Sequence, residues 1–167
     1  ERRCFLQSSS VAVASTLAWL VPRSVGAAPA KARIKVGQIG VGHDHASGKM
    51  ATLRKLADQY EVVGVVEPDP ALRKAWENHP AYRDLTWMTE EQLLSTPGLR
   101  AVAVETQVRD LVPAAARCVA AGVHIHLDKP AGESLAAFQR VLDEASRRRL
   151  TVQMGYMFRN NPAFQFC

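Results

Sequence analysis

Short runs of β-branched and apolar residues alternate with segments of helical periodicity along most of this chain. This alternation is the feature that most limits the folds the chain can adopt. Strands connected by helices of about a dozen residues predict right-handed βαβ units and a parallel sheet covered on both faces. The pattern predicts strands at 34–39, 60–66, 85–87, 101–104, 123–127 and 151–154. We therefore expect an α/β fold with a doubly wound parallel sheet of six strands, the Rossmann arrangement.

Helix-terminus signals support the segments between these strands. Helices are predicted at 45–56, 70–77, after Thr89, at 112–121 and after Ser134. Thr89 to Gln92 has the spacing of a capping box, and Ser134 can cap the following helix. Gly122 is suited to end the preceding helix, because glycine readily adopts a left-handed conformation. One buried stripe is expected on the last helix, made of Leu135, Phe138, Val141, Leu142 and Ala145.

A glycine-rich turn follows the first predicted strand. Gly40 and Gly42 occupy the first two positions of a GxGxxG motif, and His45 stands at the third. The first glycine permits the tight turn, and the second lets the backbone approach a pyrophosphate at the positive N-terminus of the next helix. His43 and His45 are interpreted as polar groups of this phosphate-binding turn. The motif predicts a dinucleotide site.

Glu67 ends the second predicted strand. A carboxylate at this edge of the sheet accepts hydrogen bonds from the hydroxyls of the adenosine ribose and repels a 2′-phosphate. The residue therefore favours NAD over NADP as the cofactor. Glu67 lies 27 residues after Gly40, which is longer than the usual separation of about 20 residues. A solvated charge at the end of a strand remains the alternative interpretation.

Two later segments carry a family resemblance. Residues 122–130 read GVHIHLDKP and residues 155–162 read GYMFRNNP. They resemble the AGxHVxxEKP and GxxxRxxP elements of the Gfo/Idh/MocA oxidoreductases. With the glycine turn, Glu67, and Thr106 after the fourth strand, the match runs in order from residue 34 to residue 164.

The resemblance implies roles for individual residues. Lys129 would lie between the nicotinamide and the substrate, orient a substrate hydroxyl and assist its proton transfer. Asp128, which replaces the glutamate of the family, would support it. Pro130 would follow a cis peptide bond, and Arg159 would lie near the substrate unless it forms a surface or interdomain salt bridge. Leu111 stands where the family commonly has a histidine. The residues expected to bind the cofactor are Gly40, Gly42, His43, His45, Glu67, Thr106, Lys129 and Pro130.

The first 30 residues have the pattern of an export signal. Arg2, Arg3 and the following Phe-Leu pair resemble a twin-arginine motif, and an apolar run and a small-x-small site ending at Ala30 follow. The run is shorter than the ~20 residues needed to span a membrane as a helix. We expect cleavage after Ala30, export of the folded protein with its cofactor by the twin-arginine translocase, and a periplasmic or extracellular location. An N-terminal membrane anchor and an ordinary secretory signal are the alternatives.

The expected domain organisation is a signal at 1–30, a Rossmann domain at 31–156, and the start of a second α/β substrate domain at 157–167. The chain is interpreted as a fragment that is inactive alone. The main catalytic histidine is expected beyond Cys167, and the missing domain is expected to mediate homo-oligomer formation. The predicted function is hydride transfer between NAD and a sugar, polyol or related carbohydrate. A glycosidase that uses bound NAD and a non-catalytic nucleotide-binding module are the alternatives.

Charge and cysteine content argue against several other classes. The net charge is +5, and much of the excess comes from residues 147–149, at the end of a predicted helix where cations oppose the helix dipole. No basic stripe with interleaved aromatics indicates nucleic-acid binding. Three widely spaced cysteines do not make a disulfide framework. No metal site is expected, because no Cys, Asp or Glu set converges on the pairs His43/His45 and His124/His126 in the sequence.

Overall fold

The chain divides into two compact units, residues 1–30 and residues 31–167. A computed structural model describes residues 32–159 and 161–165, so the description concerns the second unit. The predicted export signal lies outside the described residues. Among those residues, no helix has the length and apolar character needed to cross a membrane.

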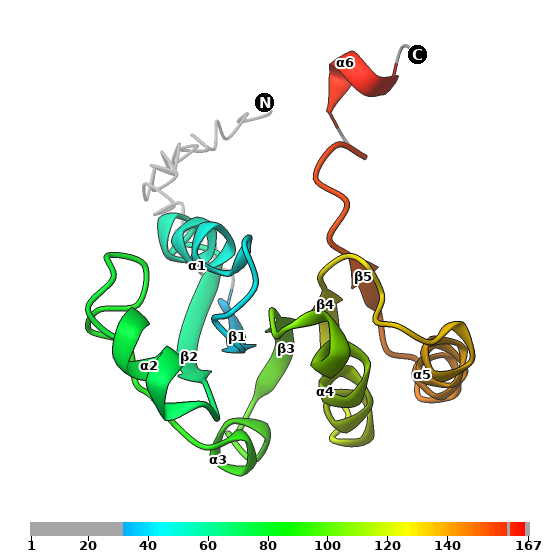
Figure 1. Cartoon of the computed structure of the whole chain (residues 1–167), viewed down its shortest axis with the longest axis horizontal. Helices are drawn as coiled ribbons and strands as arrows, with labels where there is room; N and C mark the ends of the chain where they lie inside the picture. Colours follow the sequence, from blue (N-terminus) through cyan, green and yellow to red (C-terminus); the bar gives the residue numbers. More distant parts are fainter. Residues whose placement is uncertain (1–31, 160, 166–167) are drawn as a thin grey trace, which may run out of the picture. The chain divides into compact units, whose positions relative to one another are not determined.

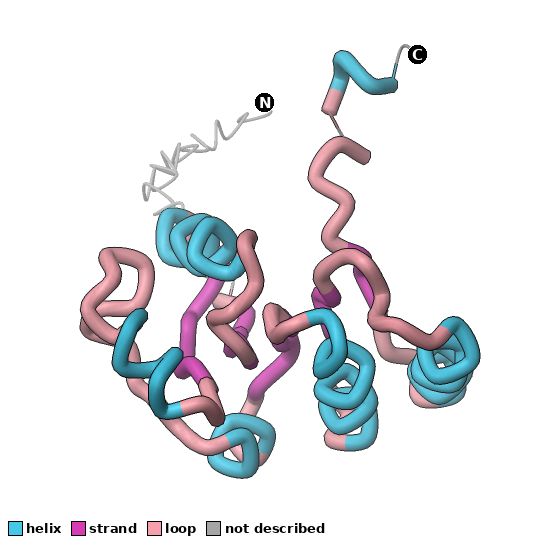
Figure 2. Tube along the Cα trace, viewed as in Figure 1, coloured by secondary structure: helices cyan, strands magenta, loops and turns pink. Residues whose placement is uncertain are grey.

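Five parallel strands form one sheet in the order β2-β1-β3-β4-β5, and helices alternate with them along the chain (Figures 1 and 2). The strands are β1 (Ile34–Ile39), β2 (Tyr60–Val66), β3 (Leu99–Val104), β4 (His124–Leu127) and β5 (Val152–Met154). The helices are α1 (Ala46–Lys55), α2 (Pro70–Trp76), α3 (Glu90–Leu94), α4 (Val108–Ala120), α5 (Leu135–Arg147) and α6 (Pro162–Gln165). The predicted fold class is confirmed.

Hydrophobic clusters form on both faces of the sheet, with α1 on one side and α4 and α5 on the other (Figure 1). Met50 of α1 packs with Val65 and Tyr82 in the smaller cluster, and Leu72 and Trp76 of α2 contact it. The larger cluster joins strands β1 to β4 with α3, α4 and α5. Burial on both faces explains why the strands read as apolar runs rather than as alternating patterns.

The predicted strand at 85–87 is wrong. Trp87 forms only an isolated bridge to Val65, and two backbone hydrogen bonds hold it there, from Val65 N to Thr86 O and from Met88 N to Val65 O. The Trp87 ring lies 5.9 Å from that of Tyr82. Aromatic packing rather than a continuing ladder therefore accounts for the apolar character of this segment.

Two predictions about helices also need correction. Helix α4 begins at Val108 rather than at Val112 and contains Pro113 in its interior. A proline lacks one N–H donor, and burial of Leu111 in the core favours the longer helix despite that loss. Leu135 is 82% exposed, so the predicted stripe on α5 is buried only in its later part, at Val141 and Ala145.

The predicted capping residues are confirmed. Thr89 and Gln92 form a reciprocal capping box at α3. Ser134 accepts a hydrogen bond from the backbone N–H of Ala137 at the start of α5. Gly122 follows α4 with a φ of +81°. The Thr89 and Ser134 signals thus mark where α3 and α5 begin, and Gly122 marks where α4 ends.

Candidate functional site

The turn between β1 and α1 forms one side of the site. Gly40 has a φ of +89°, and a Cβ atom added to it would lie 2.6 Å from the backbone N of Thr106. Its own N–H donates to the carbonyl of Val66 at 2.8 Å, and the N–H of His43 donates to the carbonyl of Glu105. Within the described part of the chain, no side chain caps the N-terminus of α1. The turn is therefore held by the ends of β2 and β3, and the first turn of α1 is left without a side-chain acceptor.

Glu67 lies beside this turn. Its Oε2 accepts a hydrogen bond from the backbone N–H of Val41 at 2.9 Å, and its Oε1 accepts one from Asp69 N at 3.0 Å. A cleft of about 250 Å³ is lined by Gly42, Glu67 and Thr106, among other residues. The long separation from Gly40 is taken up by α1 and a turn at residues 56–59. The carboxylate thus reaches the position expected from the sequence, at the end of the strand next to β1.

Asp128 lies directly after β4, is completely buried and forms the centre of a polar cluster. Its Oδ1 accepts a hydrogen bond from the backbone N–H of Lys129 at 2.7 Å. Its Oδ2 lies 2.8 Å from Nδ1 of His43, 3.0 Å from Nδ1 of His45 and 3.2 Å from Nζ of Lys49. Burial alone would raise the pKa of this carboxyl group. The Lys129 N–H and the Lys49 ammonium outweigh burial, so the pKa of Asp128 lies well below its usual range.

The expectation that no carboxylate converges on His43 and His45 is wrong, because Asp128 contacts both rings. His124 and His126 point to one face of β4, as a strand requires. Their ring nitrogens do not converge with those of His43 and His45 on Asp128. His126 nevertheless lies near the cluster, because burial and the Lys49 charge lower its pKa to about 4 while Asp128 opposes the shift.

Glu105 directly follows β3 and is also completely buried. Its Oε1 accepts a hydrogen bond from Nζ of Lys49 at 2.9 Å, and its Oε2 has no partner within the described part of the chain. Burial raises the pKa of Glu105 to about 8, although Lys49 opposes the shift. Strands β3 and β4 pair in parallel, with Val104 beside Leu127. Glu105 and Asp128 thus lie at neighbouring strand ends, and Lys49 bridges them from α1.

Neither Lys49 nor Glu105 was expected from the sequence. Lys49 follows His45 by one helical turn, and Glu105 immediately precedes Thr106 at the carboxyl end of a strand. Both positions carry a signal, since residues at strand ends and in the first helical turn of this fold face the same edge. The apolar surroundings that bury both groups could not be read from the linear pattern.

The remaining predicted residues lie near the cluster or apart from it. The peptide bond between Lys129 and Pro130 is cis, as the resemblance implies. Lys129 is exposed, while its backbone carbonyl lies 3.1 Å from Nε2 of His43. Thr106 is half-buried at the end of β3. Arg159 is exposed and forms no ion pair with the other described residues, and Leu111 is completely buried in α4. A histidine at the Leu111 position would therefore be placed in the core.

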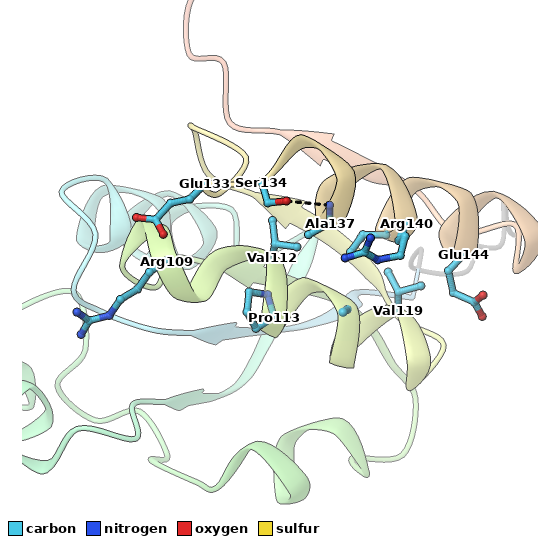
Figure 3. Close-up of a pocket in the computed structure, with 11 residues that line it drawn as sticks. Arg109, Val112, Pro113, Val119, Glu133, Ser134, Ala137, Arg140 and Glu144 are labelled. Atoms are coloured by element: carbon cyan, nitrogen blue, oxygen red, sulfur yellow. Dashed lines mark hydrogen bonds between the residues drawn. The ribbon is translucent and has the colours of Figure 1, made fainter.

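A larger groove, of about 420 Å³, lies away from this cluster between α4 and α5 (Figure 3). Arg109 and Glu133 lie at one end and Arg140 and Glu144 toward the other, with apolar side chains of both helices between them. The glycine turn, Glu67 and Asp128 do not line it. We therefore place the candidate site at the carboxyl edge of the sheet, where the perturbed carboxyl groups lie.

Comparison with known proteins identifies the family. Residues 34–156 match the sequence profile of the Gfo/Idh/MocA family, described as an oxidoreductase family with an NAD-binding Rossmann fold. The matched segment contains the glycine turn, Glu67, the carboxyl cluster and Lys129. The comparison with curated proteins found no match.

Solved structures share the fold. The WlbA dehydrogenase of Chromobacterium violaceum, in complex with NADH and UDP-GlcNAcA, superposes with a TM-score of 0.69 at 21% identity over 80% of this chain and 38% of its own. The WlbA dehydrogenase of Bordetella pertussis, with the same two ligands, gives a TM-score of 0.69 at 18% identity over 81% and 41%. The UDP-N-acetylglucosamine 3-dehydrogenase GnnA of Acidithiobacillus ferrooxidans gives 0.65 at 23% identity over 81% and 42%. This chain therefore spans about two fifths of the length of these proteins.

Proposed function

Because the chain belongs to the Gfo/Idh/MocA family of oxidoreductases with an NAD-binding Rossmann fold, we propose that it is the nucleotide-binding part of a dehydrogenase that acts on a sugar, polyol or related carbohydrate. One observation carries the proposal. The glycine turn, the uncapped start of α1 and the Glu67 carboxylate all meet at one edge of the sheet. The substrate class rests on fold relatives that were crystallised with a sugar nucleotide.

The described residues fit a dinucleotide. A Cβ atom at Gly42 would meet the Cδ1 of Leu72 at 3.3 Å, so glycine keeps this part of the cleft open. The first N–H groups of α1 attract the pyrophosphate, as helix N-termini attract anions. Glu67 accepts hydrogen bonds from the adenosine ribose and repels a 2′-phosphate. NAD is therefore the proposed cofactor, in preference to NADP.

Lys129 is the proposed proton-transfer residue of this chain. The bound nicotinamide accepts or supplies the hydride in such reactions. Lys129 holds the substrate hydroxyl by hydrogen bonding and assists its proton transfer. Asp128 fixes the backbone of Lys129 through its hydrogen bond of 2.7 Å. Arg159 is proposed to contact the substrate, and a histidine beyond Cys167 is proposed to be the main acid and base.

Substitution of Glu67 by glutamine tests the cofactor assignment. We expect NADH affinity to fall about 10- to 100-fold, because a hydrogen bond to a charged group contributes about 1.5–3 kcal/mol. We also expect the preference for NADH over NADPH to narrow, because the repulsive charge is lost. Calorimetric titration of the chain with both nucleotides measures the two effects.

The matched control is Glu61→Gln, which changes an exposed carboxylate at the start of β2 that pairs with Arg33 at 3.3 Å. It should leave both affinities unchanged. Tighter binding of NADPH than of NADH by the unsubstituted chain would contradict the role of Glu67. Binding of neither nucleotide by a folded chain would refute the proposed function.

A second candidate, nucleotide binding without turnover, is favoured by one observation. Leu111 occupies a position where the family commonly has a histidine, and it is completely buried. Accumulation of NADH during substrate turnover by the full-length protein would exclude this candidate. It would also exclude a glycosidase that oxidises its substrate only transiently, because such an enzyme regenerates its NAD in each cycle.

Export is part of the proposal and rests on the sequence of residues 1–30. The paired arginines Arg2 and Arg3 and the small-x-small site at Ala30 support passage through the twin-arginine translocase. Replacement of both arginines by lysine should abolish export while leaving the folded protein inside the cell, as fractionation and immunoblotting would show. Undiminished export of this variant would contradict the route. The whole protein is proposed to form homo-oligomers through the domain expected after residue 156.

A further inference from the structure

The cluster of His43, His45 and Asp128 has the composition and geometry of a metal site. One ligand atom from each residue lies within 4.8 Å of the other two. We propose that these three side chains bind one divalent transition-metal ion of the Zn²⁺ class. The proposal goes beyond nucleotide binding. His43 and His45 need no metal to form the phosphate-binding turn, and Asp128 needs none to support Lys129.

The hydrogen-bonding of His43 indicates that a cation belongs between its ring and Asp128. Its Nε2 lies 3.1 Å from the carbonyl oxygen of Lys129, which can only accept, so Nε2 carries the ring proton. This contact directs Nδ1 of the same ring at the Asp128 Oδ2, which lies 2.8 Å away. Two acceptors at this distance repel each other unless a proton or a metal ion lies between them. The backbone N–H of His45 also donates to Nδ1 of His43 at 3.3 Å, which agrees with an unprotonated Nδ1.

The distances suit a single coordination shell. The Asp128 Oδ2 lies 2.8 Å from Nδ1 of His43 and 3.0 Å from Nδ1 of His45. Imidazole nitrogen and carboxylate oxygen bind Zn²⁺ at about 2.0–2.2 Å, so two ligands at the tetrahedral angle lie roughly 3.4 Å apart. Each distance from Oδ2 to Nδ1 would therefore lengthen by about half an ångström for the three atoms, which lie within 4.8 Å of one another, to bind one ion.

The surroundings orient these ligands as outer-shell groups do in metal sites. The Lys129 carbonyl holds the distal nitrogen of His43, which directs Nδ1 at the cluster. The Lys129 N–H occupies the Oδ1 of Asp128 and leaves Oδ2 for the ion. Two imidazoles and one carboxylate suit Zn²⁺, Co²⁺, Ni²⁺ or Fe²⁺ better than Mg²⁺ or Ca²⁺, which prefer oxygen ligands throughout.

Lys49 is the group that the ion would displace from Asp128. Asp128 and Glu105 are both completely buried, and Lys49 is the ammonium that contacts both, at 3.2 Å and 2.9 Å. Because burial raises the pKa of Glu105 to about 8, this group is mostly neutral at neutral pH, and Lys49 then balances the charge of Asp128 alone. Lys49 contacts the same Asp128 Oδ2 that the ion would occupy, so Lys49 and the ion compete for this oxygen. When the ion binds, Lys49 keeps its closer contact with Glu105.

Metal titration of the untagged 167-residue chain tests the proposal. Cys4 and Cys167 are replaced by serine in every variant, so that their thiols cannot bind the metal. After removal of metal with a chelator, Co²⁺ should bind with one-to-one stoichiometry and produce visible ligand-field bands, which Zn²⁺ should displace. His43→Gln and His45→Gln should each weaken Zn²⁺ binding at least tenfold, and Asp128→Asn should do so more strongly. His79→Gln and His124→Gln are the matched controls and should leave it unchanged.

Three outcomes would overturn the proposal. The first is no saturable binding of Co²⁺ or Zn²⁺ by the folded chain. The second is binding that His43→Gln and His45→Gln leave unaltered. The third is an NMR spectrum in which His43 is protonated at both ring nitrogens and does not change when Zn²⁺ is added, because a proton would then occupy the proposed position. Circular dichroism shows whether each variant is folded, and the two histidine variants decide the test if Asp128→Asn is not. The titrations contain no nucleotide, so their outcome is independent of NAD binding.

Discussion

Substitution of Gly40 by alanine is expected to abolish nucleotide binding and to destabilise the fold by about 2–4 kcal/mol. The residue has a φ of +89°, which disfavours any side chain, and the added Cβ would lie 2.6 Å from Thr106 N and 2.7 Å from Glu105 O. Both contacts are with backbone, so the turn itself must move away from β3. The N–H of His43, which donates to Glu105 O, would move with it. Urea unfolding followed by circular dichroism measures the first effect, and calorimetric titration with NADH measures the second.

The matched control is Gly122→Ala. Gly122 has a similar φ of +81°, but an added Cβ would meet no other atom within 4 Å. This variant should lose about 1 kcal/mol through the left-handed backbone alone and should bind NADH normally, because it lies at the opposite end of β4. Equal losses of stability in the two variants would show that the contact with β3 is unimportant. A Gly40→Ala variant that binds NADH normally would contradict the role of the turn.

Substitution of Lys49 by methionine is expected to destabilise the chain by roughly 3–5 kcal/mol at pH 9, because it leaves two buried carboxyl groups without their shared cation. The loss should be smaller at pH 6. Burial raises the pKa of Glu105 to about 8, so this group is neutral in the folded chain at pH 6 and needs no counterion there. Urea unfolding of both proteins at pH 6 and pH 9 gives the difference.

The sign of the pH effect follows from the raised pKa. A group whose pKa is raised by folding contributes its full stability below the pKa that it has in the unfolded chain, which is 4.5 for Glu105. This stability is lost as the pH rises through about 8, the pKa of Glu105 in the folded chain. Above that pH, the unsubstituted chain retains the ion pair between Glu105 and Lys49, and the variant does not. Lys55→Met, at the exposed end of the same helix, should cost less than about 0.5 kcal/mol at either pH. A loss for Lys49→Met that is the same at pH 6 and pH 9 would contradict the assignment of Glu105.

Local chemistry accounts for the parts of the fold that the sequence predicted. The capping box of Thr89 and Gln92, the Ser134 cap and the left-handed Gly122 each depend on a few neighbouring residues. The prediction failed where packing outweighs such signals. The helix start predicted at Val112 is wrong, because burial of Leu111 extends α4 by four residues, to Val108. Leu135 fits the apolar period of α5 and yet is exposed.

The candidate site likewise combines residues whose positions follow from local sequence with residues that only packing brings together. The positions of Gly40, Gly42, Glu67 and Lys129 could be predicted, because each belongs to a motif whose spacing reflects one strand and the loop that follows it. The cluster around Asp128 could not, because its members come from α1, the turn before it, and the ends of β3 and β4, and are separated by up to 85 residues, the difference between positions 128 and 43. Their contact depends on the order of the strands in the sheet.

The sequence by itself thus determined the order of strands and helices, the glycine turn and the residues at each strand end. These features depend on backbone conformation and local hydrogen bonds, which short segments specify. Only the tertiary structure decided that Asp128, Glu105, Lys49 and the two turn histidines share one buried space. Burial also decided their charge states, because the pKa of a carboxyl group depends on the water it loses and the cations it meets. A carboxyl group neither loses this water nor meets these cations until the strands have paired.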